Sequence, residues 1–397
     1  METICVPPTA ASKKLHLGNL YTWILIDAYR KAKIQQGDLV FAEESWNCYS
    51  QKLEEKVRAE IPFAKEERII EKCKQEVTDA INLGQREIKK YQIVFDEKVI
   101  RDDSEEYSAF VSEYIKNAEM EHRIINGMIK IPSSETILER VSKIRWAPKG
   151  IEKRLNGSKT LQNISKIGLF RKGTYGVFGK NGEVYGQRFI QSLLPEFYSY
   201  SGKNNLSGIF GNDVLTKWIY FMIANSKKSS FKNIALSGMI LDHSGKKISK
   251  YTADIPLLKD LEKFNPDCVR LGLLKKTFGN DFKVPEFKEE EKLRRKVVNC
   301  VRYLSSYANI SEMKNSYVHP NLGLSLEYRS VLDSVTSFKF NEGYNKFRKF
   351  ICDKISKKVI GEVKLNRISK RDKQEILNVV RNLGEIFTPT SLDIPLT

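Results

Sequence analysis

The chain has 397 residues, 41% of them hydrophobic, which is enough for two or three domains with a sizeable core. Its net charge of +18 indicates a polyanionic partner, although a surface that serves only solubility is the alternative. No apolar run approaches the roughly 20 residues of a membrane span, and the N-terminus has no apolar signal region. We therefore expect a cytoplasmic protein with no membrane partner. The six cysteines form no Cys-x-x-Cys pair, so neither a structural zinc nor a disulfide framework is expected.

The chain opens with a pattern of strand, turn and helix. An apolar run at 3–6 is short enough for a buried strand, and apolar residues after position 19 recur at helical spacing. The turn at 7–19 would aim backbone N–H groups and the positive end of a helix dipole at an anion. Gly18 leaves room for a flat ligand, and His16 lies at the mouth of the turn. This pattern predicts a nucleotide site; the alternative is that His16 only packs and caps the helix.

The middle of the chain changes pattern twice. Residues 1–110 alternate strand and helix patterns, with a second strand expected at 39–42. Residues 119–187 are rich in glycine and predict an inserted, partly β subdomain. Between 143 and 188 there are eleven lysines and arginines against two glutamates, which suits contact with a nucleic-acid strand.

The second half of the chain first resumes the sheet pattern and then becomes helical. Residues 188–260 read as strands and helices, and from Pro266 onward the periodicity is helical. Ser369 could cap the last helix, whose Ile376, Leu377, Val380 and Leu383 form one apolar stripe. We expect such stripes to form a core rather than a binding surface.

A second stretch, residues 245–251, carries three lysines after a glycine. Together with residues 16–19 it resembles the paired signatures of class I aminoacyl-tRNA synthetases, written HIGH and KMSKS and here HLGN and KISKY. Residues 7–10 and 45–49 resemble runs of the isoleucyl and valyl enzymes, and residues 238–242 resemble the strand that introduces KMSKS. The chain is therefore similar to the methionyl, isoleucyl, valyl and leucyl subgroup.

The resemblance implies an α/β fold, in which a small connective insertion splits a Rossmann-like doubly wound parallel sheet and an α-helical bundle follows. Residues 1–118 and 188–260 would form the two halves of the catalytic domain. Residues 119–187 would be the connective insertion that faces the acceptor end of tRNA, and they are too few for an editing domain. Residues 261–397 would resemble a reduced anticodon-binding domain.

The implied activity is that of an ATP-dependent aminoacyl-tRNA ligase. The carboxylate of an amino acid attacks the α-phosphate of ATP, pyrophosphate leaves, and the aminoacyl group passes to tRNA. His16 and Asn19 would donate to the phosphates, while Lys247 and Lys250 would close over the β- and γ-phosphates. Mg²⁺ would be bound largely through the phosphates of the nucleotide. The plain alternative for the lysines is a solvated turn.

The resemblance also assigns the substrate-binding residues. Asp213 would accept from ribose hydroxyls, and its alternative role is a helix N-cap. The ATP-binding residues would be Gly18, Gly211, Asp213, Met239 and Ser249, and the amino-acid-binding residues would be Pro8, Thr9, Ala10, Trp46 and Asn47. No protein metal ligands are expected.

The sequence departs from the family pattern in three places. Asn19 replaces the second histidine of HIGH but is still a hydrogen-bond donor. Asn47 stands where the isoleucyl-like run carries the aspartate that holds the α-ammonium of the substrate. Either Glu43 or Glu44 compensates for the lost charge, or the substrate lacks a free amine. Residues 188–202 occupy the place of the family's Trp-Phe-Asp-Ala/Ser segment without reproducing it.

Two other functions stay open beside the aminoacyl-tRNA ligase. One is a paralogue that adenylates an amino acid for a biosynthetic pathway or takes a modified substrate. The other is a non-catalytic regulator that binds tRNA. The sequence does not decide between amino acids or acceptors, and it leaves the oligomeric state open.

Overall fold

The computed structural model describes residues 1–11, 15–156, 166–177, 183–226, 231–248, 257–307, 324–364 and 368–392. The chain forms two compact units that are interleaved along the sequence. Unit 1 comprises residues 1–14, 41–86 and 95–237, and unit 2 comprises residues 15–40, 87–94 and 238–397. In the described part, no helix is both long enough and apolar enough to span a membrane. The consecutive domain limits expected from the sequence stay a prediction.

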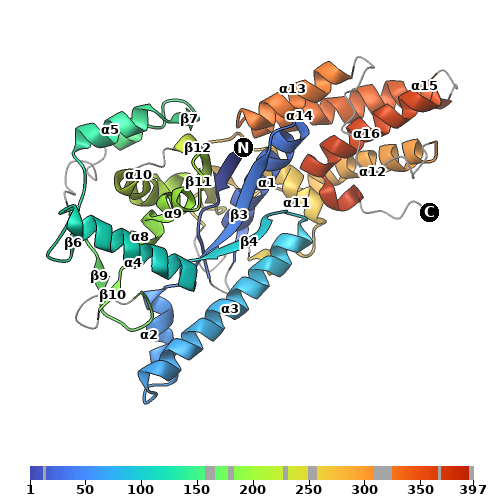
Figure 1. Cartoon of the computed structure of the whole chain (residues 1–397). Helices are drawn as coiled ribbons and strands as arrows, with labels where there is room; N and C mark the ends of the chain where they lie inside the picture. The colour runs from blue at the N-terminus through green and yellow to red at the C-terminus, as the bar shows by residue number, and fades with distance from the viewer. Residues whose placement is uncertain are drawn as a thin grey trace. The chain divides into compact units, whose positions relative to one another are not determined.

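Unit 1 is built on a seven-stranded sheet in the order β2–β3–β1–β11–β12–β7, with β4 beside β3 (Figure 1). The pairs β1–β11, β11–β12, β12–β7, β2–β3 and β3–β4 are all parallel. The central strands are apolar and buried, as expected where helices cover both faces of a parallel sheet. This arrangement confirms the predicted α/β fold. The strands are β1 (Glu2–Cys5), β2 (Thr9–Ala10), β3 (Val40–Asn47), β4 (Asp96–Arg101), β7 (Arg145–Ala147), β11 (Leu206–Gly211) and β12 (Phe231–Ser237).

The helices of unit 1 are anchored by serine caps and aromatic packing. Ser50, Ser104 and Ser133 each accept a hydrogen bond from the first turn of the helix that follows. Phe110 of α4 and Phe197 of α9 pack edge to face. The helices are α2 (Gln51–Glu60), α3 (Glu66–Lys90, whose last turn belongs to unit 2), α4 (Glu105–Met120), α5 (Ser134–Ser142), α6 (Lys153–Asn156), α8 (Gln187–Ser192), α9 (Leu194–Tyr200) and α10 (Tyr220–Asn225).

The region expected to be an insertion is only partly separate from the main sheet. Its small strands are β5 (Ile124–Ile125), β6 (Met128–Lys130), β8 (Lys166–Gly168), β9 (Phe170–Arg171) and β10 (Val184–Tyr185), and they pair antiparallel among themselves. Strand β7, in contrast, joins the parallel sheet beside β12. A strand of three residues is too short to show a period in the sequence, so this edge strand was not predicted.

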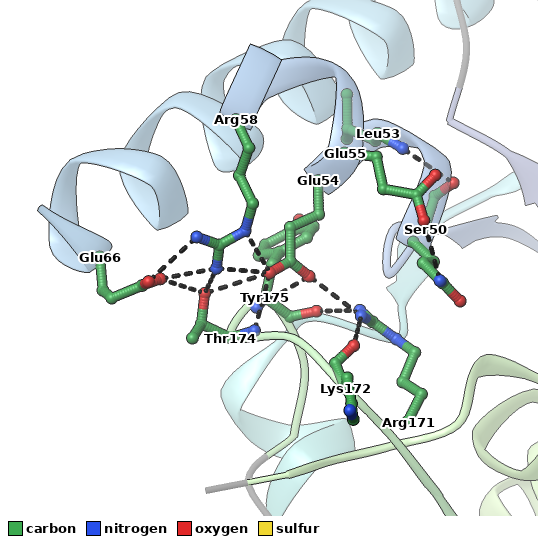
Figure 2. A network of polar contacts seen from close by, with 11 residues as sticks. Ser50, Leu53, Glu54, Glu55, Arg58, Glu66, Arg171, Lys172, Thr174 and Tyr175 are labelled. Carbon is green, nitrogen blue, oxygen red and sulfur yellow. Dashed lines mark hydrogen bonds and ion pairs between the residues drawn. The ribbon is translucent and has the colours of Figure 1, made fainter. Parts of the chain in front are cut away.

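The carboxylate of Glu54 on α2 ties the segment after β9 to the rest of unit 1 (Figure 2). It accepts from the backbone N–H of Thr174 at 2.8 Å, from Arg171 at 2.9 Å and from Arg58 at 2.9 Å. Arg58 also pairs with Glu66 at the start of α3. Burial raises the pKa of Glu54, but these donors prevail and hold it below its usual value.

Unit 2 is mainly helical. Ser369 caps its last helix by accepting from Asp372 N, and the predicted stripe from Ile376 to Leu383 is buried, so both expectations are confirmed. The aromatic side chains Tyr344 and Phe347 are likewise core residues. The elements are α1 (Leu17–Gln35), β13 (Ile240–Leu241), α11 (Pro266–Leu274), β14 (Phe282–Lys283), α12 (Glu291–Ser305), α13 (Ser325–Thr336), α14 (Phe340–Lys349), a π-helical segment (Phe350–Val359), α15 (Ile360–Lys364) and α16 (Lys370–Phe387), with 3₁₀ turns at Leu258–Leu261, Phe287–Glu290 and Pro389–Leu392.

A buried ion pair holds α1 against the later helices of unit 2. Asp27 on α1 pairs with Arg270 on α11 at 2.5 Å, and both side chains are 2% exposed or less. Arg270 also donates to the carbonyl of Ile386 on α16 at 2.6 Å, and Lys31 lies 3.0 Å from Asp27. Arg270 therefore connects α1 to both α11 and α16 within this unit.

Candidate functional site

The α1 turn (residues 15–19) presents donors at the start of helix α1. His16 is the N-cap: its Nδ1 accepts from Gly18 N at 3.1 Å, while Asn19 Oδ1 accepts from His16 N at 3.2 Å. With Nδ1 as an acceptor, the proton of the neutral imidazole lies on Nε2, so Nε2 is the ring's donor. Asn19 likewise keeps its amide nitrogen as a donor. No acidic residue lies in the first turn, so this helix end suits an anion.

Gly18 has no room for a side chain, since a Cβ at this position would lie 2.9 Å from His16 Cε1. Its expected contact with a nucleotide stays a prediction. Gly18 is needed because the ring folds back over the backbone to cap the helix. The capping role of His16, offered as an alternative, is present together with the donor geometry.

The lysine hairpin (residues 240–248) displays part of the second motif in the same unit. Leu241 bridges Lys247, and Ile248 N donates to Ile240 O at 3.0 Å. Asp242 closes the turn by accepting from Lys246 N at 2.9 Å, and Gly245 takes a φ of +85°. The lysines at 246 and 247 are exposed.

Within unit 2, the chain returns to the α1 turn after the second motif. Leu257 forms an isolated antiparallel bridge with His16, and Leu258 N donates to Leu15 O at 3.2 Å. Leu257 and Leu258 are therefore anchored at the helix start that carries His16. Ser249 and Lys250, both expected in the site, lie outside the described residues.

The remaining expected nucleotide residues lie at two strand ends. Met239 lies between β12 and β13 in unit 2, where its N–H donates to Asp281 at 2.7 Å. In unit 1, Gly211 ends β11 and begins the turn that contains the exposed Asp213. A Cβ on Gly211 would meet Asp213 Oδ1 at 2.8 Å, so this glycine allows the carboxylate to approach the backbone. The cap of the turn is Gly211, and the N-cap role considered for Asp213 is wrong.

The residues expected to bind the amino acid gather at the carboxyl end of β3 in unit 1. Strand β3 runs to Asn47, five residues beyond its expected end. Strand β2 pairs Thr9 with Trp46 and Ala10 with Asn47, and Pro8 directly precedes β2. Ligands of open α/β sheets bind outside the carboxyl ends of the strands, so these five residues lie at the edge where a substrate is expected.

A residue that the sequence analysis did not select completes this edge. Gln187, the first residue of α8, donates from Nε2 to Asn47 Oδ1 at 2.5 Å. Gln187 lies one position before residues 188–202, the stretch that does not reproduce the Trp-Phe-Asp-Ala/Ser segment. A helix start directly after a glycine was the available signal.

The two glutamates of β3 near this edge already interact with other side chains. Glu43 pairs with Lys203 at 2.5 Å. Glu44 accepts from the Trp46 indole and from Gln85, and burial raises its pKa. Neither glutamate is therefore available to replace the charge that Asn47 lacks. Of the two explanations considered from the sequence, this argues against compensation by Glu43 or Glu44.

Two aspartates after β4 differ in charge. Burial raises the pKa of Asp102 to about 7, although its carboxylate accepts from Cys48 N at 2.7 Å. Burial also opposes ionisation of Asp103, but Arg101 prevails and holds its pKa below the usual value. Tyr175, positioned by the Glu54 network, donates to Asp103 at 3.3 Å. This edge of the sheet therefore offers no uncompensated negative charge among these residues.

The comparisons with known proteins agree with one another. The isoleucine–tRNA ligase of Mycoplasmopsis agalactiae is 25% identical over 163 residues, and the valine–tRNA ligase of Tropheryma whipplei is 26% identical over 159 residues. These matches cover 39% and 36% of this chain. Each covers only 17% of the relative, so the chain matches less than a fifth of the length of these curated relatives. No family model matches.

Solved structures align with this chain over nearly its whole length. A methionyl-tRNA synthetase of Mycobacterium tuberculosis, solved with methionyl-adenylate, aligns with a TM-score of 0.71 at 13% identity, covering 98% of this chain and 92% of that one. The chain therefore resembles class I aminoacyl-tRNA synthetases in sequence over the matched segments and in fold over nearly its whole length.

Proposed function

We propose that this chain is a class I synthetase that activates an amino acid of the methionine, isoleucine, valine or leucine type with ATP and transfers it to tRNA. The observation that carries the proposal is the α1 turn, where His16 Nδ1 accepts from Gly18 N and Asn19 Oδ1 accepts from His16 N, so that both side chains are fixed at the start of the helix. A helix start with such donors and no acidic residue fits a phosphate group. Leu257, ten residues after Lys247 in the sequence, bridges His16, which supports a role for Lys247 at the same helix end.

The reaction would be an in-line displacement. A carboxylate oxygen forms a bond to the α-phosphorus of ATP, and the bond from that phosphorus to the β-phosphate oxygen breaks, releasing pyrophosphate. His16 and Asn19 would donate to the phosphates, and Lys247 with Lys250 would neutralise the charge on the leaving group. Asp213 would accept from the ribose hydroxyls. Little covalent chemistry falls to the protein, which mainly positions the reactants.

Magnesium fits this chemistry through the nucleotide. Among the residues that the structure describes, no three His, Cys, Asp or Glu side chains are grouped so that they could hold a metal ion. Mg²⁺ would therefore be held largely by the phosphates of ATP, where it would offset their negative charge. The protein would contribute cationic and neutral donors around that complex.

The partner expected from the charge is tRNA. Residues 119–187 would be the connective insertion, and the exposed Arg145, Lys149 and Lys153 would contact the phosphates of the acceptor end. Residues 261–397 would serve as a reduced anticodon-binding domain. The exposed Arg348 and Lys349 on α14 are suitable phosphate contacts, since their aromatic neighbours are buried.

ATP–pyrophosphate exchange tests the proposal. The protein would be incubated with ATP, labelled pyrophosphate and each candidate amino acid, and then with total tRNA. Exchange followed by charging of tRNA supports the complete activity. Exchange without charging supports an adenylating paralogue, and RNA binding without exchange supports a non-catalytic regulator.

A further inference from the structure

The pair formed by Asn47 and Gln187 determines which chemical groups the end of β3 presents. Asn47 is the last residue of β3 and is only 5% exposed. Its position is fixed by the β2–β3 pairing and by a hydrogen bond of 2.9 Å from Ala11 N to its carbonyl. Gln187 Nε2 donates to its side-chain oxygen at 2.5 Å. The side-chain oxygen of Asn47 thus already has a donor.

The remaining polar group of the Asn47 side chain is its amide nitrogen, which can donate but not accept. An ammonium group has three donors and no acceptor, so it finds no complementary group in such a nitrogen. A hydroxyl oxygen or an acyl carbonyl oxygen is complementary to this nitrogen, because both accept hydrogen bonds. Gln187 Oε1 is the other polar atom of the pair and accepts as an uncharged oxygen. The pair therefore offers a donor to a neutral acceptor, whereas it offers a cation no ionised group.

The surrounding charges do not reverse this preference. Glu43 is neutralised by Lys203, and Glu44 is engaged by the Trp46 indole and by Gln85. Asp102 directly follows β4, which pairs with β3, and burial favours its protonated form up to about neutral pH. A cation at the Asn47–Gln187 pair would lose hydration without gaining an ionised partner from these groups.

We propose that the substrate activated at the end of β3 is a carboxylic acid that carries a neutral acceptor, such as a hydroxyl or an acylated amine, in place of the α-ammonium. This inference rests on the proposed adenylation step, and it replaces the free amino acid as the substrate of that step with an acid that has the same side chain and no free amine. The chemistry permits it: the carboxylate oxygen attacks the α-phosphorus and pyrophosphate leaves, while the α-substituent neither gains nor loses a bond.

Matched acids test the inference directly. Exchange would be measured with L-methionine, L-isoleucine, L-valine and L-leucine, and with the 2-hydroxy and N-acetyl acids that have the same side chains. We expect a hydroxy or acyl acid to exceed its parent amino acid in kcat/KM by about tenfold or more, since the charge-assisted bond that an ammonium needs is missing. Equal or better exchange with the amino acid overturns the inference. No exchange with any of the twelve acids overturns the adenylation activity itself.

Charge variants provide the second test. Asn47→Asp introduces a carboxylate at the pair and should shift the selectivity about tenfold toward the amino acid. Gln187→Glu introduces the carboxylate on the other residue of the pair and should also shift the selectivity toward the amino acid. It replaces Asn47→Asp as the test if that variant lowers the melting temperature. Asn345→Asp makes the same charge change at an exposed position of α14 and should leave the selectivity unchanged. If both variants at the pair leave the selectivity unchanged, the assignment is wrong.

Discussion

Two regions of the molecule differ in the charged groups that they present: the α1 turn with the lysine hairpin, and the end of β3. In unit 2, donors gather at a helix start and the lysines of the hairpin are exposed. In unit 1, Asn47 is paired with another amide, and the neighbouring carboxylates are neutralised or engaged. A group that binds phosphate needs positive potential, whereas a group that selects a substrate needs matched donors and acceptors. Substitutions should therefore reduce rate in the first region and change stability or selectivity in the second.

The largest effect is expected at the lysine motif. Lys247→Ala and Lys250→Ala should each lower the rate of pyrophosphate exchange by about 10²- to 10³-fold, because each removes a cation from the developing charge on pyrophosphate. The melting temperature of Lys247→Ala should stay nearly constant, since this side chain is exposed. Lys246→Ala, its exposed neighbour, is the matched control. An unchanged rate in both variants would remove the motif at residues 245–251 from the mechanism.

The next effect is on stability, at Glu54. Glu54→Ala should lower the free energy of unfolding by about 3 kcal/mol, because it leaves Arg171 and the Thr174 N–H without their buried acceptor. Urea denaturation measures the loss. Glu55→Ala, on the exposed face of the same helix, should change stability by less than about 0.5 kcal/mol. Equal effects for the two glutamates would show that the network in Figure 2 contributes little.

His16 allows capping to be separated from catalysis. His16→Ala should lower the exchange rate by about 10²-fold and stability by about 1 kcal/mol, since it removes both the Nε2 donor and the N-cap. His16→Asn should restore the stability, because asparagine is a strong N-cap, but not the rate. Exchange kinetics and urea unfolding on the same preparations measure the two quantities. Recovery of both by asparagine would mean that His16 only caps α1.

The smallest effect is a pH dependence at Asp102. Its folded-state pKa of about 7 lies above the usual value, so the native state holds a proton that the unfolded chain releases above about pH 4. The stability from this proton is complete below about pH 4 and is lost as pH rises through 7. Asp102→Asn should therefore become more stable relative to the parent as pH rises from about 4 to about 7, and the difference should stay constant above pH 7. Parallel stability curves would place the Asp102 pKa near its ordinary value.

The sequence predicted the fold well and the site unevenly. Buried strands, the cap at Ser369 and the stripe from Ile376 to Leu383 depend on local periodicity and cap chemistry, which one sequence contains. Strand β7 was missed because three residues cannot show a period. The close approach of the His16 ring to Gly18 could not be predicted, because the direction in which the ring folds is a matter of side-chain packing.

The pairing of Asn47 was beyond sequence reasoning for a similar reason. Its partner, Gln187, is 140 positions away, and Lys203, which pairs with Glu43, is 160 positions from that glutamate. Sequence comparison identified the missing aspartate but could not say what neutralised its neighbours. Such assignments require coordinates, since long-range contacts decide them.

The ion pair between Asp27 and Arg270 has a practical consequence for anyone who wants a minimal fragment of this protein. Helix α1 begins at the capping histidine near the N-terminus, yet its buried aspartate depends on an arginine that is itself held by the carbonyl of Ile386. A truncation that removes the last two dozen residues would expose this arginine and loosen the helix at the opposite end of the sequence. The N-terminal half should therefore not be expressed alone as an autonomous nucleotide-binding module.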